Sequence, residues 1–257
     1  MSKLTKKKFE KILNTLGIEE GDNLLVSSNI LKILYNHKNP ITSLEIIECL
    51  KKKISSNGNL LFPAYNWGFC EGENFHYKNT KSLTGALGNL TLKLKEFKRS
   101  INPIYSFLIY GKDANYISNL KHSSCFGLKE TPFGHLINNN GKNLFIGLDY
   151  KEALTFVHVA EEEARAEYRY FKYFKGTYTY NSGISKKVTY KMYVRRLRQV
   201  LGTLVHKKFD NELIKNNALS KTSIGNIKFA VIDIKKTYDL ILKDLKSERK
   251  YIYTVKR

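Results

Sequence analysis

The feature that most constrains the fold is an apolar run, an amphipathic segment and a second apolar run within residues 23–63. The first run reads N-L-L-V-S-S from residue 23, and the second reads N-L-L-F from residue 59, with Pro63 expected to end it. Between them, Thr42 and Glu45 have the spacing of a capping box, which predicts a helix over residues 43–53. Strand, helix and strand in this order predict a parallel α/β unit, and therefore a layered α/β fold.

Further segments extend this pattern along the chain, each with the periodicity or the boundary residues typical of its type. We expect helices over residues 4–16, 155–172 and 237–245, strands over 105–110, 143–148 and 227–232, and a hairpin of 176–180 with 187–194 around Asn181-Ser182-Gly183. The change of character near residue 170 predicts an α/β core over residues 1–170 and a smaller, basic α+β lobe over residues 171–257. No low-complexity linker separates the two, so we expect them to pack as one structural unit.

Charge bears on the choice of partner, because 44 Lys and Arg against 23 Asp and Glu give a net charge of +21. A basic surface favours anionic partners such as nucleic acid, an anionic membrane surface or phosphorylated small molecules. It is equally typical of a lysine-rich solvated surface without a partner. Interleaved aromatic and basic residues over 168–198 are compatible with a nucleic-acid stacking groove, and also with a hairpin that has a solvated lysine face.

The three cysteines, Cys49, Cys70 and Cys125, are widely spaced. This pattern fits neither a C-x-x-C zinc site nor a disulfide framework, and the six histidines have no metal-ligand spacing. No apolar run approaches the roughly 20 residues that cross a bilayer, and the lysine-rich start lacks the apolar region of a secretory signal. We therefore expect a cytoplasmic protein with neither a metal site nor a membrane span.

His158 is the first candidate for chemistry, in the segment T-F-V-H-V-A-E. Glu161 follows three residues later, and on a helix the two side chains share a face. A carboxylate beside an imidazole fixes the tautomer and stabilises the imidazolium that forms when the ring takes a proton. A histidine among apolar residues is also typical of a core or interface, so the spacing alone leaves both interpretations open. Serine hydrolase, P-loop and dinucleotide-binding patterns are absent.

The order of several short segments around His158 is more specific than any one of them. Gly21-Asp22 precedes L-L-V-S-S (24–28), and there follow G-N-L-L-F-P-A-Y-N-W (58–67), T-K-S-L-T-G-A-L (80–87), R-S-I-N-P-I-Y-S-F-L-I-Y-G (99–111), F-G-L-K-E-T-P-F-G (126–134), G-K-N-L-F-I-G (141–147) and T-F-V-H-V-A-E (155–161). In this order they resemble the aminoglycoside 3-N-acetyltransferase family, also called the antibiotic N-acetyltransferase family. The resemblance covers roughly residues 15–175, and in the tail only residues 223–233.

The resemblance implies a layered α/β/α structure with a mixed sheet, distinct from the small GNAT acetyltransferase fold, and acetyl-CoA as co-substrate. It implies that His158 is the general base, with Glu161 as the candidate carboxylate that orients it. The residues expected to line the acetyl-CoA tunnel are Ser27, Ser28, Thr80, Ser82, Arg99 and Ser100. Arg99 is also compatible with a surface arginine, and the first two serines with strand-end hydroxyls bonded to backbone.

Departures from the family pattern bear on the acceptor. The family usually has a histidine at the position of Ser27, another at that of Asn102, and P-T where this chain has Pro63-Ala64. Aminoglycosides are polycations, which a basic protein repels at long range. We therefore predict acetylation of a nucleotide-linked amino sugar for surface polysaccharide synthesis, with no specific nucleic acid as partner. The alternatives are an aminoglycoside 3-N-acetyltransferase and a non-enzymatic nucleic-acid binder.

Overall fold

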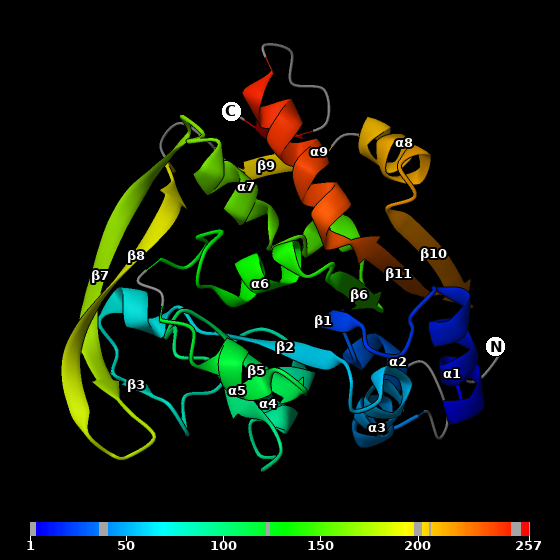
Figure 1. The fold of residues 1–257 in the computed structure, drawn as a ribbon, viewed down its shortest axis with the longest axis horizontal. Coiled ribbons are helices and arrows are strands. Elements are labelled where there is room, and N and C mark those ends of the chain that lie inside the picture. Colours follow the sequence, from blue (N-terminus) through cyan, green and yellow to red (C-terminus); the bar gives the residue numbers. More distant parts are fainter. Residues whose placement is uncertain are drawn as a thin grey trace.

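A seven-stranded mixed sheet lies at the centre of the computed structural model, which describes residues 4–35, 41–121, 124–197, 202–205, 207–247 and 253–256 (Figure 1). Its strands run in the order β10 (Leu219–Ile224), β11 (Ile227–Asp233), β6 (Lys142–Ile146), β1 (Asn23–Ser28), β2 (Asn59–Tyr65), β5 (Tyr105–Gly111) and β4 (Lys98–Arg99). β1 is parallel to both of its neighbours, β2 and β6, whereas the outer pairs are antiparallel. The predicted layered α/β fold with a mixed sheet is thus confirmed.

Helices cover both faces of this sheet because successive strand residues point to opposite faces. Leu24 and Leu60 pack into one apolar core, and their neighbours Leu25 and Leu61 pack into the other. The first core is covered by α1 (Lys6–Thr15), α3 (Ser43–Ile54) and α4 (Ala86–Thr91), and the second by α6 (Pro132–Asn138), α7 (Val157–Glu163) and α9 (Ile234–Lys246) (Figure 1). The other helices are α2 (Leu31–Tyr35), α5 (Ala114–Ser118), α8 (Lys207–Lys215), η1 (Gly68–Glu71) and η2 (Tyr150–Glu152).

The predicted parallel unit is confirmed in β1, α3 and β2. The Thr42 hydroxyl accepts from the Glu45 N–H (3.2 Å) and the Glu45 carboxylate accepts from the Thr42 N–H (2.8 Å), so the capping box opens α3. The prediction that Pro63 ends the second strand is wrong, since β2 continues to Tyr65. The register between β1 and β2 ends at Leu61, so the missing N–H of Pro63 removes no hydrogen bond from that ladder.

The helix predicted over residues 155–172 is much shorter in the structure. α7 spans Val157–Glu163, and Phe156, not Thr155, occupies its N-cap position. Arg165 has a φ of 53°, a left-handed conformation that a right-handed helix cannot continue through. The chain turns there and enters a strand at Arg169.

The predicted hairpin is present and longer than expected. β7 (Arg169–Thr179) pairs with β8 (Ser185–Arg195), and β3 (Phe75–His76) adds to β7 to form a second, three-stranded sheet at the left of Figure 1. A third sheet pairs β9 (Gly202–Val205) with β12 (Tyr253–Lys256). Within residues 171–257, β10 and β11 belong to the central sheet, and the division of the chain near residue 170 stays a prediction. No helix in the described ranges is long and apolar enough to cross a membrane.

Candidate active site

His158 and Glu161 lie one turn apart on α7, as their spacing predicts. The His158 Nδ1 is 2.5 Å from the Glu161 Oε2, with the Glu161 side chain fully buried and the His158 side chain 23% exposed. An ionised carboxylate only accepts hydrogen bonds, so Nδ1 carries the proton of this contact. The Arg169 Nη2 also lies 3.0 Å from Nδ1, and with this tautomer it donates to the Glu161 Oε2, at 2.8 Å, and not to the ring. The second ring nitrogen, Nε2, is therefore the unprotonated one, and this tautomer can take up a proton.

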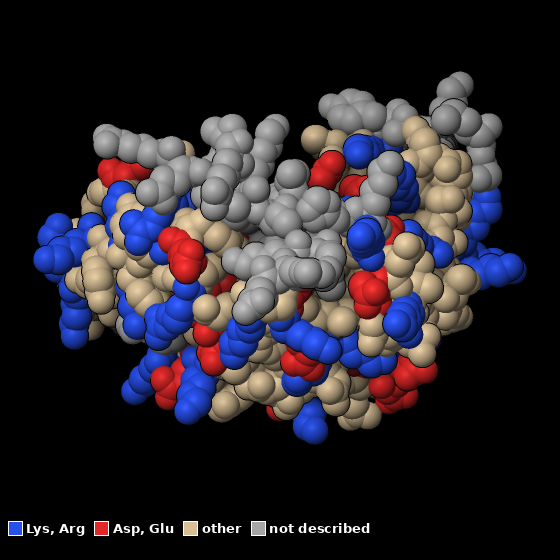
Figure 2. All heavy atoms as spheres, turned by 90° about the horizontal axis from the view of Figure 1, so that it is seen from above, with Lys and Arg blue, Asp and Glu red and all other residues tan. Residues whose placement is uncertain are grey.

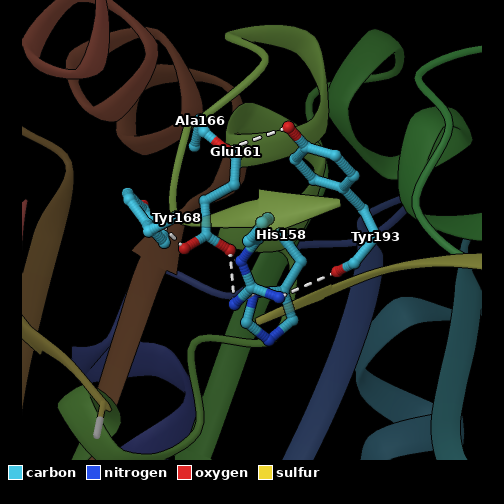
Figure 3. A network of polar contacts seen from close by, with 6 residues as sticks. His158, Glu161, Ala166, Tyr168 and Tyr193 are labelled. Carbon is cyan, nitrogen blue, oxygen red and sulfur yellow. Dashed lines mark hydrogen bonds and ion pairs between the residues drawn. The ribbon is translucent and has the colours of Figure 1, made fainter. Parts of the chain in front are cut away.

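Glu161 is held from two further sides (Figure 3). The Tyr168 hydroxyl donates to Oε1 at 2.9 Å, and the Arg169 Nη2 lies 2.8 Å from Oε2. Arg169 is itself buried at the start of β7, where its Nη1 donates to the Tyr193 carbonyl at 2.9 Å. A carboxylate without solvent exposure thus has partners on both oxygens, as a buried charge requires.

Sequence reasoning missed Tyr168 and Arg169. On the continuous helix that was predicted, Arg169 would stand about 12 Å along the axis from Glu161, at about 1.5 Å per residue. The turn at Arg165 brings it back against the carboxylate instead. The only signal in the sequence was a pair of arginines, Arg165 and Arg169, shortly after a run of glutamates, and such a pattern is too common to be specific.

The pKa values of the pair follow from its burial. Desolvation lowers the pKa of His158 below its ordinary value; the Glu161 charge acts in the opposite direction and the Arg169 charge adds to the lowering. For Glu161, burial raises the pKa, but His158, Arg169 and the Tyr168 hydroxyl together bring it below its usual range. At neutral pH the pair is accordingly an ionised carboxylate and a neutral imidazole, the state in which a histidine acts as a base.

His158 opens into a cavity of about 370 Å³ at the carboxyl ends of the parallel strands β1 and β2. The hydroxyls that line it come from Ser27 and Ser28 at the end of β1 and from Thr84 before α4. The aromatic rings that line it belong to Tyr65, Trp67 and Tyr105. Among the described lining residues, Glu152 is the one carboxylate, and there is neither Lys nor Arg. The cavity is therefore less basic than the molecule as a whole.

The residues predicted to bind acetyl-CoA divide into two groups. Ser27 and Ser28 line the cavity beside His158, and the Ser27 hydroxyl donates to the Asn143 Oδ1 at 3.2 Å. The other predicted residues do not line the cavity, and their side chains bond to backbone N–H groups. The Thr80 hydroxyl accepts from the N–H of His76, that of Ser82 from the N–H of Thr84, and that of Ser100 from the N–H of Phe107. Their part in cofactor binding stays a prediction.

Arg99 is almost completely buried on β4, where its guanidinium contacts other parts of the protein. It donates to the carbonyls of Tyr77 (3.0 Å) and Thr80 (2.7 Å) and to the Ser106 hydroxyl (3.0 Å). Desolvation lowers its pKa to about 10, which still leaves it charged at neutral pH. These bonds fix the segment that leads to Thr84 at the cavity wall.

Replacing Arg99 is therefore expected to destabilise the fold. Arg99→Met leaves two carbonyls and a hydroxyl without their donor, and we expect the free energy of unfolding to fall by about 3 kcal/mol. Denaturant unfolding measures this, with Lys98→Met, an exposed neighbour on β4, as the matched control. Unchanged stability combined with a raised KM for acetyl-CoA would instead assign the guanidinium to a CoA phosphate.

A buried carboxylate holds a histidine at the open end of two parallel strands in a layered α/β fold, and this arrangement is suited to the removal of a proton from a bound nucleophile. The family model of aminoglycoside 3-N-acetyltransferases matches residues 26–246. The chain belongs to this family, which consists of N-acetyltransferases that use acetyl-CoA. No group of His, Cys, Asp or Glu suited to a metal ion occurs among the residues that the structure describes.

Known proteins similar to the chain agree with this membership. The SPbeta prophage-derived aminoglycoside N(3')-acetyltransferase-like protein YokD of Bacillus subtilis is 27% identical over 180 residues, which are 61% of this chain and 64% of that protein. The chain thus spans slightly less than two thirds of this curated relative.

Solved structures share the fold over nearly the whole chain. AAC-IIIb in a binary complex with CoASH superposes with a TM-score of 0.78 at 18% identity, covering 95% of this chain and 97% of that one. For AAC-VIa bound to sisomicin the TM-score is 0.76 at 16% identity, with 97% and 100% covered. The crystal structure of YokD from Bacillus subtilis gives 0.75 at 19% identity, with 95% and 93% covered. The distinction from a small GNAT fold is confirmed.

Proposed function

We propose that this chain transfers the acetyl group of acetyl-CoA to an amino group of an aminoglycoside, with His158 as the general base. The observation that carries the proposal is the orientation of His158: Glu161 holds Nδ1, and the ring lines a cavity large enough for a thioester and one amino-sugar ring. Family membership and the neighbours named for aminoglycosides support the same acceptor. The predicted location in the cytoplasm remains an expectation.

The proposed reaction needs one base and one electrophile. An amino group enters as its ammonium ion, and Nε2 of His158 takes the proton that must leave before nitrogen can attack the thioester carbonyl. The new carbon–nitrogen bond forms, the carbon–sulfur bond breaks, and the thiolate of CoA takes the proton from the imidazolium. The acylated nitrogen still carries one proton more than an amide, and it releases that proton to water. Glu161 stabilises that imidazolium while it exists, and binding both substrates in one cavity supplies the proximity that the reaction requires.

The local charge of the cavity argues for a cationic acceptor. The net charge of +21 first suggested an anionic, nucleotide-linked sugar, but surface lysines carry it: Figure 2 shows Lys and Arg spread over one face with Asp and Glu between them. Charges farther than about 8 Å away are screened at physiological ionic strength. Glu152 is the nearer charge, and it attracts an ammonium group. The nucleotide-linked acceptor finds no support in the comparisons.

A panel of acceptors tests this assignment by following the thiol released from acetyl-CoA. We expect turnover with sisomicin- and gentamicin-type aminoglycosides and little with dTDP- or GDP-linked amino sugars. Glu152→Gln, which removes the carboxylate at the cavity, should raise KM for the aminoglycoside more than it lowers kcat. Faster acetylation of the nucleotide-linked sugars would reverse the assignment of the acceptor and leave the acetyl transfer intact.

The pH dependence of the reaction should report on Arg169. Burial and Arg169 lower the pKa of His158 below 6.5. The neutral base therefore forms as pH rises through this pKa, and kcat/KM should reach its plateau at higher pH. Arg169→Gln removes a positive charge beside the ring, so the pKa of His158 rises and the acidic limb moves to higher pH. We expect this in profiles measured with one acceptor throughout. A limb that stays in place would show that Arg169 does not act on the base.

A further inference from the structure

A second cleft, of about 980 Å³, lies on the far side of Arg99 from the catalytic cavity. The turn of the β7–β8 hairpin, the segment after β3, the segment from α4 to β4, and α5 surround it. Its lining has no residue in common with that of the catalytic cavity. The two hollows are therefore distinct in their lining, and His158 lines only the smaller one.

The charge of this cleft is one-sided. Four lysines line it, Lys78, Lys93, Lys95 and Lys98, and its described lining contains no Asp or Glu. None of the four takes part in an ion pair among the described residues. The nearest acid along the chain, Glu96, pairs with Lys51 at 3.2 Å. Four ammonium groups around one hollow repel one another, so the cleft favours an anion of multiple charge.

Aromatic rings add a second, independent feature. Tyr77, Phe97, Tyr178 and Tyr180 line the same cleft. Phe97 and Tyr178 are buried, whereas Tyr77 is partly exposed and Tyr180 is 38% exposed. Accessible rings of this kind stack on the flat faces of nucleobases, and lysines are common ligands of phosphate. A volume of about 980 Å³ is at the upper end of the range of small-molecule sites.

We propose that this cleft is a binding site for a phosphate-bearing ligand of mononucleotide size, separate from the acetyl-transfer site. The lysines bind the phosphates, and the side chains of Tyr77 and Tyr180 contact the base. Such a site would also give a role to four of the lysines that contribute to the net positive charge, which a cationic aminoglycoside does not require.

Titration calorimetry with ATP tests the proposal without any acetyl transfer. We expect saturable binding that weakens as salt rises, and inorganic pyrophosphate should compete with ATP. The triple variant Lys93→Ala, Lys95→Ala, Lys98→Ala should lose at least about tenfold in affinity, since charge-assisted bonds are lost. The matched control, Lys7→Ala, Lys11→Ala, Lys215→Ala, removes the same charge from exposed sites elsewhere and should bind ATP as the unmodified protein does. In the triple variant KM for acetyl-CoA should be unchanged.

Three results would overturn the proposal. The first is the absence of saturable ATP binding, or binding that the triple variant does not change. The second is that saturating CoA prevents ATP binding and that the triple variant has a raised KM for acetyl-CoA. This combination would show that the cleft binds the nucleotide end of the co-substrate. The third is a single-stranded oligonucleotide that binds the same lysines far more tightly than ATP does, which would make this a nucleic-acid surface. None of these outcomes bears on whether His158 catalyses acetyl transfer.

Discussion

His158→Asn should abolish most of the acetyl transfer while leaving the fold and the binding of acetyl-CoA intact. The asparagine amide can still contact Glu161, but nothing remains at the position of Nε2 to take the proton from the acceptor. General-base catalysis typically contributes about 10²–10⁴-fold, and we expect kcat to fall by that factor. Thiol release measures the rate, and calorimetry measures the affinity for acetyl-CoA in the same preparation.

His135→Asn is a matched control for this variant. His135 lies on α6, is partly buried, and has its pKa lowered by desolvation as His158 does, but it does not line the catalytic cavity. Its replacement should leave kcat unchanged. Acetyl transfer within threefold of normal in His158→Asn would refute the assignment of the base.

The layered fold and the histidine–carboxylate pair could be predicted because their causes are local. The capping box of Thr42 and Glu45 involves neighbours in sequence, and the continuous apolar runs of β1 and β2 are typical of strands buried on both faces. His158 and Glu161 meet because both lie on one helical turn. In such cases the separation of two residues in the sequence is enough to predict that their side chains meet.

The remainder of the site depends on contacts between distant segments. Arg169 reaches Glu161 only because Arg165 breaks the helix, and an arginine with positive φ has no reliable sequence signal. Arg99 was expected to line the acetyl-CoA tunnel, and its donors are directed to internal acceptors, two of them carbonyls in the segment 77–80. The prediction of a nucleotide-linked acceptor, which the comparisons do not support, rested on the net charge, and the net charge of a chain does not indicate which charges line a cavity.

Glu161→Gln should have the second large effect, and it acts on both activity and stability. The amide cannot stabilise the imidazolium, and it no longer fixes the proton on Nδ1, so we expect kcat to fall by about 10²-fold or more. Arg169 is left as a buried charge without its counter-ion, which typically costs about 3–5 kcal/mol of folding free energy. Thiol release and denaturant unfolding measure the two effects.

A double variant separates these two consequences. Adding Arg169→Met to Glu161→Gln removes the unpaired charge, so stability should recover in part while kcat stays low. Glu162→Gln, at the next position, is the matched control: that carboxylate accepts from the Ser124 hydroxyl at 3.0 Å and does not contact His158, and its loss should leave kcat nearly unchanged. If the double variant regained both stability and activity, Glu161 would be a partner of Arg169 alone. Recovery of stability without activity would instead show that the carboxylate acts through His158, because the imidazolium that Glu161 stabilises forms and disappears during the reaction.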